Sequence, residues 1–185
     1  EGVVCPKPSG AFYAIAELPV DDAENFQEIA DNVNHISLSK MAKYCYLNGA
    51  TLVHFSTDYV FDGKSKIPYT ELCNTNPVNF YGLSKLNGEE AIKKSKCNYV
   101  IIRTSWVFSE YGNNFFKTMM RLTQKDKLRI VNDQFGAPTY APDIALATIE
   151  IINKIKKKDV KEIYHFTGDD SWVYFFKTEG NTRKK

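Results

Sequence analysis

The sequence predicts an α/β fold in which helices flank a parallel sheet. Short apolar runs alternate along the chain with segments of helical periodicity, an order typical of strand–helix–strand units. Two of these runs, residues 51–56 and 98–103, are almost continuously apolar, as expected for strands covered on both faces. Because such sheets bind ligands at the carboxyl ends of their strands, residues that directly follow these runs are the first candidates for a site.

The order of the predicted elements supports one domain, with a small second lobe from about residue 107 onward. Apolar residues at helical spacing predict the first helix, and Asn48-Gly49 predicts its end. Pro77 opens the second helix. The predicted helices are residues 23–47, 79–96, 113–125 and 142–158, with a shorter one from residue 171, and the predicted strands are residues 51–56, 98–103, 128–131 and 162–167.

Composition excludes several classes of protein. The 185 residues are 43% hydrophobic and 25% charged, and the net charge of +2 gives no reason to expect nucleic acid or membrane as a partner. The sequence has no apolar run long enough to span a bilayer and no signal-peptide pattern. Its four cysteines (Cys5, Cys45, Cys73 and Cys97) form no C-x-x-C pair and no zinc-ligand pattern. These features predict a cytoplasmic protein with reduced thiols and no metal site.

Tyr81 and Lys85 form the sharpest catalytic candidate. Residues four apart share one face of a helix, so the lysine ammonium would lie beside the phenol and lower its pKa from about 10. Such a tyrosine exchanges a proton with a substrate oxygen near neutral pH, and the lysine can hydrogen-bond a cofactor ribose. From spacing alone, however, an ordinary pair on a helix surface explains the pattern better.

The surroundings of this pair favour a functional role. Gly82 and Gly88 lie in the same predicted helix, where each costs about 1 kcal/mol relative to alanine, so we expect something to approach that backbone closely. Ser56 and Thr57 lie at the end of a predicted buried strand, and a hydroxyl there could bond a carbonyl oxygen held by Tyr81. The alternative for both hydroxyls is simple turn capping.

Several short motifs follow one another in a fixed order. They are residues 56–63 (S-T-D-Y-V-F-D-G), 76–77 (N-P), 81–85 (Y-G-L-S-K), 103–107 (R-T-S-W-V), 112–115 (G-N-N-F), 132–134 (N-D-Q) and 136–139 (G-A-P-T). In this order they resemble the dTDP-4-dehydrorhamnose reductase family of the extended short-chain dehydrogenase/reductases. The resemblance extends from about residue 20 to residue 172 and implies a Rossmann-like sheet.

The resemblance implies a role for each matching residue. Tyr81 would donate the proton, Lys85 would assist it and hold the nicotinamide ribose, and Thr57 would hydrogen-bond the sugar carbonyl. Asp58 and Trp106 would contact the substrate, although a turn-capping aspartate and a core tryptophan are their plain alternatives. The implied reaction is hydride transfer from NADPH (or NADH) to C4 of dTDP-4-dehydro-L-rhamnose, a dTDP-4-dehydro-6-deoxy sugar, giving dTDP-L-rhamnose. The loop 132–139 would line the side of the nucleotide sugar.

The sequence departs from this family at its beginning. None of its ten glycines forms the glycine-rich turn that approaches a dinucleotide pyrophosphate, so we expect a partial Rossmann-like sheet whose first βαβ cofactor-binding unit is missing. We therefore expect weak NADPH binding and a tendency to associate, including as a homodimer. Residues 1–19 instead resemble a short segment of class I aminotransferases. The predicted division is 1–19 foreign segment, 20–177 reductase-like domain and 178–185 tail.

Two other functions compete with the reductase. The first is a non-catalytic binding subunit, like the regulatory subunit of methionine adenosyltransferase. That related group shares the fold and much of the same set of motifs, so this sequence resembles it as well. The second is a fragment without a function of its own. Turnover of the 4-keto sugar with NADPH would distinguish the reductase from both.

Overall fold

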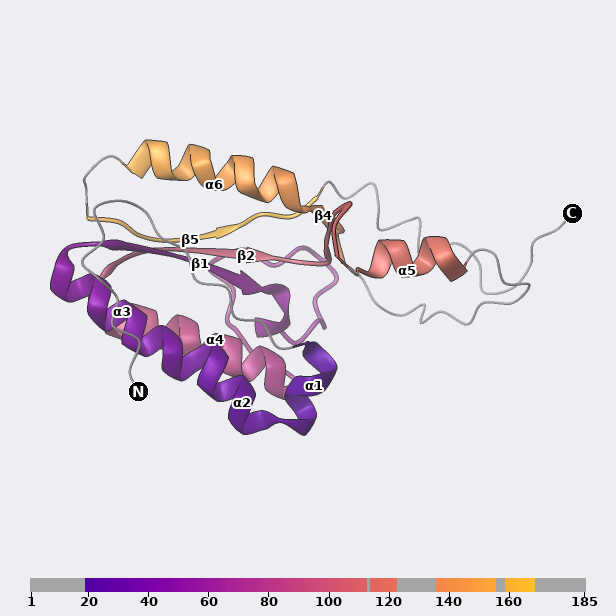
Figure 1. Cartoon of the computed structure of the whole chain (residues 1–185), viewed down its shortest axis with the longest axis horizontal. Coiled ribbons are helices and arrows are strands. Elements are labelled where there is room, and N and C mark those ends of the chain that lie inside the picture. The colour runs from indigo at the N-terminus through magenta and orange to yellow at the C-terminus, as the bar shows by residue number, and fades with distance from the viewer. Residues whose placement is uncertain (1–18, 113, 123–135, 156–158, 169–185) are drawn as a thin grey trace, which may run out of the picture.

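The protein is built around a three-stranded parallel sheet with helices on both faces (Figure 1). The computed structural model describes residues 19–112, 114–122, 136–155 and 159–168. Helices α3 (Ser37–Asn48) and α4 (Phe80–Lys94) cover one face of the sheet, and α6 (Ala141–Ile155) covers the other (Figure 1). On the side of α3 and α4, the short helices α1 (Val20–Asn25) and α2 (Gln27–Asp31) pack against α4. The predicted α/β class is therefore confirmed.

The sheet has the strand order β1-β2-β5, with β2 in the centre. Its strands are β1 (Thr51–Thr57), β2 (Asn98–Thr104) and β5 (Lys161–His165), which confirms three of the predicted strands. In the parallel register Thr57 lies opposite Thr104, and Arg103 lies opposite His165. The carboxyl ends of the three strands therefore meet at one edge. The predicted strand 128–131 and the helix predicted from residue 171 lie outside the described residues.

The helical segment before β1 is less regular than the single helix predicted there. It consists of α1 (Val20–Asn25), α2 (Gln27–Asp31), a π-helical turn η1 (Asn32–Ile36) and α3 (Ser37–Asn48). The break falls at Phe26, whose backbone is non-helical. Phe26 and Ile29 are more than half exposed, and the packed stripe consists of smaller or polar side chains. The buried residues are Ala23, Ala30, Asn34, Leu38, Ala42 and Cys45.

The remaining elements follow the predicted order closely. Helix α4 starts one residue after its N-cap Asn79, whose side chain accepts a hydrogen bond from the backbone of Gly82 at 2.8 Å. Two short strands form a second parallel sheet after the end of β2. These elements are the 3₁₀ turn η2 (Asp58–Val60), α4 (Phe80–Lys94), β3 (Val107–Phe108), α5 (Phe115–Leu122), β4 (Thr139–Tyr140) and α6 (Ala141–Ile155).

The core lies on both sides of β2, because successive side chains of a strand point to opposite faces. Tyr99 and Ile101 pack toward α3 and α4, in a cluster that includes Leu38 and Ile92. Val100 and Ile102 form the other cluster, which Val53 of β1 and Ile151 and Ile155 of α6 complete. Both clusters hold the strands whose ends carry the predicted site.

At Gly88, helix α4 lies close against η1 and the start of α3. A Cβ at this position would lie 2.1 Å from the carbonyl oxygen of Asn34 and 2.7 Å from Leu38 Cδ1. We expect Gly88→Ala to lower the free energy of unfolding by about 1–3 kcal/mol, because the overlap outweighs the higher helix propensity of alanine. Urea denaturation measures this difference. The exposed Lys40→Ala on α3 is the control and should change stability by less than about 0.5 kcal/mol; equal stability of both variants would contradict the close contact.

Candidate functional site

Thr57 and Asp58 lie where β1 ends and η2 begins. The buried Thr57 hydroxyl accepts a hydrogen bond from the backbone N–H of Tyr59 at 3.2 Å and donates one to Asp58 Oδ1 at 3.1 Å. Burial raises the pKa of Asp58, while the hydrogen bond from Thr57 acts in the opposite direction. Thr57 therefore caps the turn η2. Its position at the end of β1 also puts this hydroxyl at the carboxyl edge of the sheet.

Tyr81 and Lys85 occupy the first two turns of α4 and approach the same end of β1. The ring of Tyr81 meets the ring of Tyr59 edge-on, with 5.5 Å between centroids and 89° between planes. Lys85 Nζ donates a hydrogen bond of 2.8 Å to the carbonyl of Phe55, two residues before Thr57. The pair is therefore in contact with the strand end and its turn, and is more than an ordinary surface pair.

Gly82 permits this arrangement. A Cβ at Gly82 would lie 2.2 Å from the carbonyl oxygen of Tyr59, so only glycine lets the start of α4 come this close to η2. Glu24 of α1 also accepts a hydrogen bond of 2.6 Å from the backbone N–H of Phe80. The close approach predicted from this glycine is confirmed.

Trp106 follows the end of β2, two residues beyond the partner of Thr57. Its φ of 45° is uncommon for a bulky side chain, and such conformations cluster at functional sites. The ring packs near Phe115, with 6.1 Å between centroids. A Cβ on Gly136 would lie 2.5 Å from the indole, so the tryptophan rests directly against this glycine.

The segment after β2 is joined to residues 136–139, which belong to the loop expected to line the nucleotide sugar. Ser105 Oγ donates to the carbonyl of Ala137 at 2.7 Å, and the N–H of Thr139 donates to the carbonyl of Trp106 at 3.2 Å. Residues 132–135 of the same predicted loop lie outside the described residues. The structure thus groups Thr57, Asp58, Tyr81 and Lys85 around the end of β1, and places Trp106 after the adjacent strand.

A buried ion pair beneath these residues was missed by the sequence analysis. Glu89 of α4 is fully buried, and Arg103 of β2 is 3% exposed. Arg103 donates to both carboxylate oxygens of Glu89, from Nε at 3.0 Å and from Nη2 at 2.7 Å. Ser56 Oγ donates to the same carboxylate at 2.5 Å. An available signal was that Glu89 lies four residues after Lys85, on the same helix face.

The ion pair continues to β5 and to the loop that follows η2. Arg103 Nη1 lies 3.4 Å from His165 Nε2, and its guanidinium lies 5.2 Å from the ring centroid of Phe61. Phe61 stacks on Tyr69, and the carboxylate of Glu71 accepts a hydrogen bond of 2.8 Å from the N–H of His165. Polar contacts therefore join the ends of all three strands of the main sheet.

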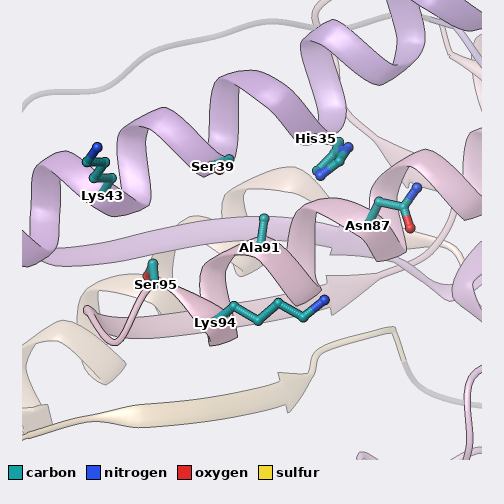
Figure 2. A pocket seen from close by; sticks show the side chains of 7 residues that line it. All are labelled: His35, Ser39, Lys43, Asn87, Ala91, Lys94 and Ser95. Atoms are coloured by element: carbon teal, nitrogen blue, oxygen red, sulfur yellow. The ribbon is translucent and has the colours of Figure 1, made fainter.

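A separate groove lies between α3 and α4, away from the predicted residues. Its volume is about 390 Å³, and Figure 2 shows its walls, one from each helix. Because none of the five predicted site residues lines it, we assign it no role. The lining residues are His35, Ser39, Lys43, Asn87, Ala91, Lys94 and Ser95.

Other classes of site find no support within the described ranges. There, no group of histidine, cysteine and acidic side chains could hold a metal ion, and no helix is long and apolar enough to cross a membrane. Cys45 and Cys97 are buried and Cys73 is partly buried, each as a free thiol; Cys5 lies outside the described residues.

His54 of β1 should make the fold acid-sensitive. Burial, and secondarily the charge of Lys85, lower the pKa of His54 to about 3. In the unfolded chain, His54 binds this proton near pH 6.5. The stability that neutral His54 contributes to the fold is therefore fully present above pH 6.5 and is lost as the pH falls toward 3. We expect a loss on the order of 1–2 kcal/mol by about pH 5, measured by urea denaturation. His54→Gln should flatten this dependence; the same slope in both chains would contradict the shifted pKa.

Comparison with known proteins places this geometry in a family. Residues 7–178 match the model of the RmlD substrate binding domain. The chain belongs to this family. It is 41% identical over 170 residues to a dTDP-4-dehydrorhamnose reductase of Escherichia coli strain K12, a match that covers 90% of this chain and 57% of that protein. The family resemblance seen in the sequence motifs is confirmed.

Solved structures of the same family share the fold. The dTDP-4-dehydrorhamnose reductase of Bacillus anthracis, crystallised in complex with NADP, has a TM-score of 0.76 at 40% identity, over 88% of this chain and 57% of that one. An orthologue from Clostridium acetobutylicum has a TM-score of 0.78 at 38% identity, over 87% and 57%. The Rossmann-like assignment is thereby confirmed.

The chain spans about 57% of the length of these relatives. The family match begins at residue 7, within the segment 1–19 for which a resemblance to aminotransferases was expected. Residues 1–18 lie outside the described residues, and the division into 1–19, 20–177 and 178–185 remains a prediction.

Proposed function

We propose that this chain carries the proton-donating and sugar-binding part of an NADPH-dependent reductase that converts dTDP-4-dehydro-L-rhamnose to dTDP-L-rhamnose. The observation that carries the proposal is the convergence of α4 and β1. Lys85 of the Tyr81–Lys85 pair is hydrogen-bonded to the strand whose end holds the Thr57 hydroxyl. Membership of the family and the names of the relatives support the reductase over a non-catalytic regulatory subunit.

Each residue has a defined task in the proposed reaction. Tyr81 donates a proton to the C4 oxygen of the sugar as that oxygen becomes a hydroxyl. Lys85, one helical turn on, favours the ionised phenol that remains after the transfer. The Thr57 O–H, which is directed at Asp58 Oδ1 in the structure, would turn to donate to the same ketone oxygen. Asp58 and Trp106 would contact the sugar. Orientation of the ketone against these donors is the main contribution of the chain.

The donors near Tyr81 fit the ribose end of a nicotinamide cofactor. A phenol and an ammonium at the carboxyl edge of a parallel sheet are suited to ribose hydroxyls, and this edge is where such sheets bind nucleotides. NADPH (or NADH) would supply the hydride. No residue of this sequence is assigned to its pyrophosphate, because the glycine-rich turn is absent from the 185 residues. We place the reaction in the cytoplasm.

A turnover assay on the full chain tests the proposal. The chain is incubated with the 4-keto sugar and a high concentration of NADPH, and formation of dTDP-L-rhamnose is measured by chromatography. Lys85→Met should lower kcat by about 10²-fold or more, because the phenolate loses its neighbouring charge. The exposed Lys43→Met on α3 is the matched control and should keep the original rate. No turnover in the unchanged chain, or equal rates in both variants, would contradict the proposal.

A further inference from the structure

We infer that Ser56 and Glu89 are positioning residues: the buried Ser56–Glu89–Arg103 network sets the place of Thr57 relative to Tyr81 and Lys85. The inference rests on the proposed function for its catalytic meaning. Its geometric content, the dependence of the Thr57 turn on this network, can be tested without turnover.

Glu89 shares one face of α4 with the catalytic pair. Tyr81, Lys85 and Glu89 are four residues apart in turn, so all three point from the helix toward the same side. Tyr81 contacts the Tyr59 ring of η2. Lys85 donates a hydrogen bond to the carbonyl of Phe55, and the Glu89 carboxylate accepts one from a side chain of β1. One helix face therefore carries both the proposed proton donor and its supports.

Three consecutive residues of β1 have three complementary tasks. Phe55 accepts the hydrogen bond from Lys85, Ser56 donates to Glu89, and Thr57 presents the hydroxyl that caps η2. Two hydrogen bonds from α4 thus hold the two residues directly before Thr57. Since a catalytic group that is misplaced by about 1 Å can cost about 10²-fold in rate, such support has a measurable consequence.

Arg103 extends the same control to the segment that carries Trp106. Arg103 lies on β2, three residues before Trp106 in the chain. Its guanidinium donates to Glu89 and lies close to His165 on β5. A buried ion pair contributes little net stability compared with apolar side chains of similar size, because desolvation offsets the attraction. The geometry, in which the carboxylate also accepts from Ser56 of β1 and the guanidinium reaches His165 of β5, points to positioning as the role of this pair.

Ser56→Ala removes the link to β1 while leaving the ion pair in place. In nuclear magnetic resonance spectra of the full chain, we expect the amide signal of Tyr59 and the ring signals of Tyr81 to shift in this variant. The matched control is Ser95→Ala, which removes a serine hydroxyl bonded to the Ile92 carbonyl at the other end of α4. This control should leave both sets of signals in place. Unchanged Tyr59 and Tyr81 signals in Ser56→Ala would overturn the inference.

The effect on kcat and KM distinguishes a positioning role from a purely structural one. Ser56→Ala should lower kcat by about 10-fold or more with little change in KM, because the residue acts through Thr57 and not on the substrate. In a Thr57→Val background the same change should have no further effect on kcat. An additive loss of kcat in the Ser56→Ala, Thr57→Val double variant would contradict the inference. An unchanged kcat in Ser56→Ala alone would contradict it as well. Signal shifts in a chain without turnover would uphold the positioning and reject only the reductase function.

Discussion

Under the proposed function, Tyr81→Phe should abolish most of the turnover of dTDP-4-dehydro-L-rhamnose. The substitution keeps the ring that meets Tyr59 edge-on and removes only the phenolic hydroxyl. Because general acid catalysis contributes about 10²–10⁴-fold, we expect kcat to fall by this factor while KM for the sugar changes little. The measurement is the initial rate of NADPH oxidation with dTDP-4-dehydro-L-rhamnose as the substrate.

The control for Tyr81 is a tyrosine that shares none of its contacts. Tyr46 on α3 is 52% exposed and lies in the segment before β1. Tyr46→Phe should retain the rate of the unchanged chain, and both variants should unfold at similar urea concentrations. If Tyr81→Phe turned over as fast as Tyr46→Phe, Tyr81 would not be the proton donor.

Glu89→Ala should cause the largest loss of stability of any single change proposed for this chain. It leaves the guanidinium of Arg103, 3% exposed, without its charged partner and leaves the Ser56 hydroxyl without its acceptor. Removing one partner of a buried pair costs about 3–5 kcal/mol, because the remaining charge stays desolvated. Urea denaturation at neutral pH measures this loss.

The adjacent glutamate provides the matched control. Glu90 pairs with Lys93 at 2.8 Å on the exposed side of α4, and its side chain is 44% exposed. Glu90→Ala should cost less than about 1 kcal/mol, since solvent screens such pairs. The double variant Glu89→Met with Arg103→Met should recover much of the lost stability, because it leaves no unpaired charge. Equal costs for Glu89→Ala and Glu90→Ala would refute the buried pair.

Local patterns were enough to predict most elements and the residues that precede or follow them. The apolar runs of β1 and β2 and the start of α4 after Asn79 were placed within two residues, because burial and helix initiation depend on nearby sequence. The irregular helical segment before β1 was not predicted, because in the sequence Phe26 and Ile29 form part of an apolar stripe typical of one continuous helix. Close packing against α4 instead selects smaller or polar side chains at the contact, such as Ala30 and Asn34.

By itself, the sequence determined the parallel α/β fold, its family and the candidate residues Thr57, Tyr81 and Lys85, since each depends on residue types at short, readable spacings. Only the tertiary structure decided that Glu89 meets Arg103 and Ser56 beneath them. These partners are 14 and 33 residues away from Glu89 in the chain. No local rule pairs charges at such separations, and a glutamate in a helix normally faces water. The strand register and the approach of α4 to the sheet bring the three side chains together, and only that packing turns an apparent surface charge into a support of the site.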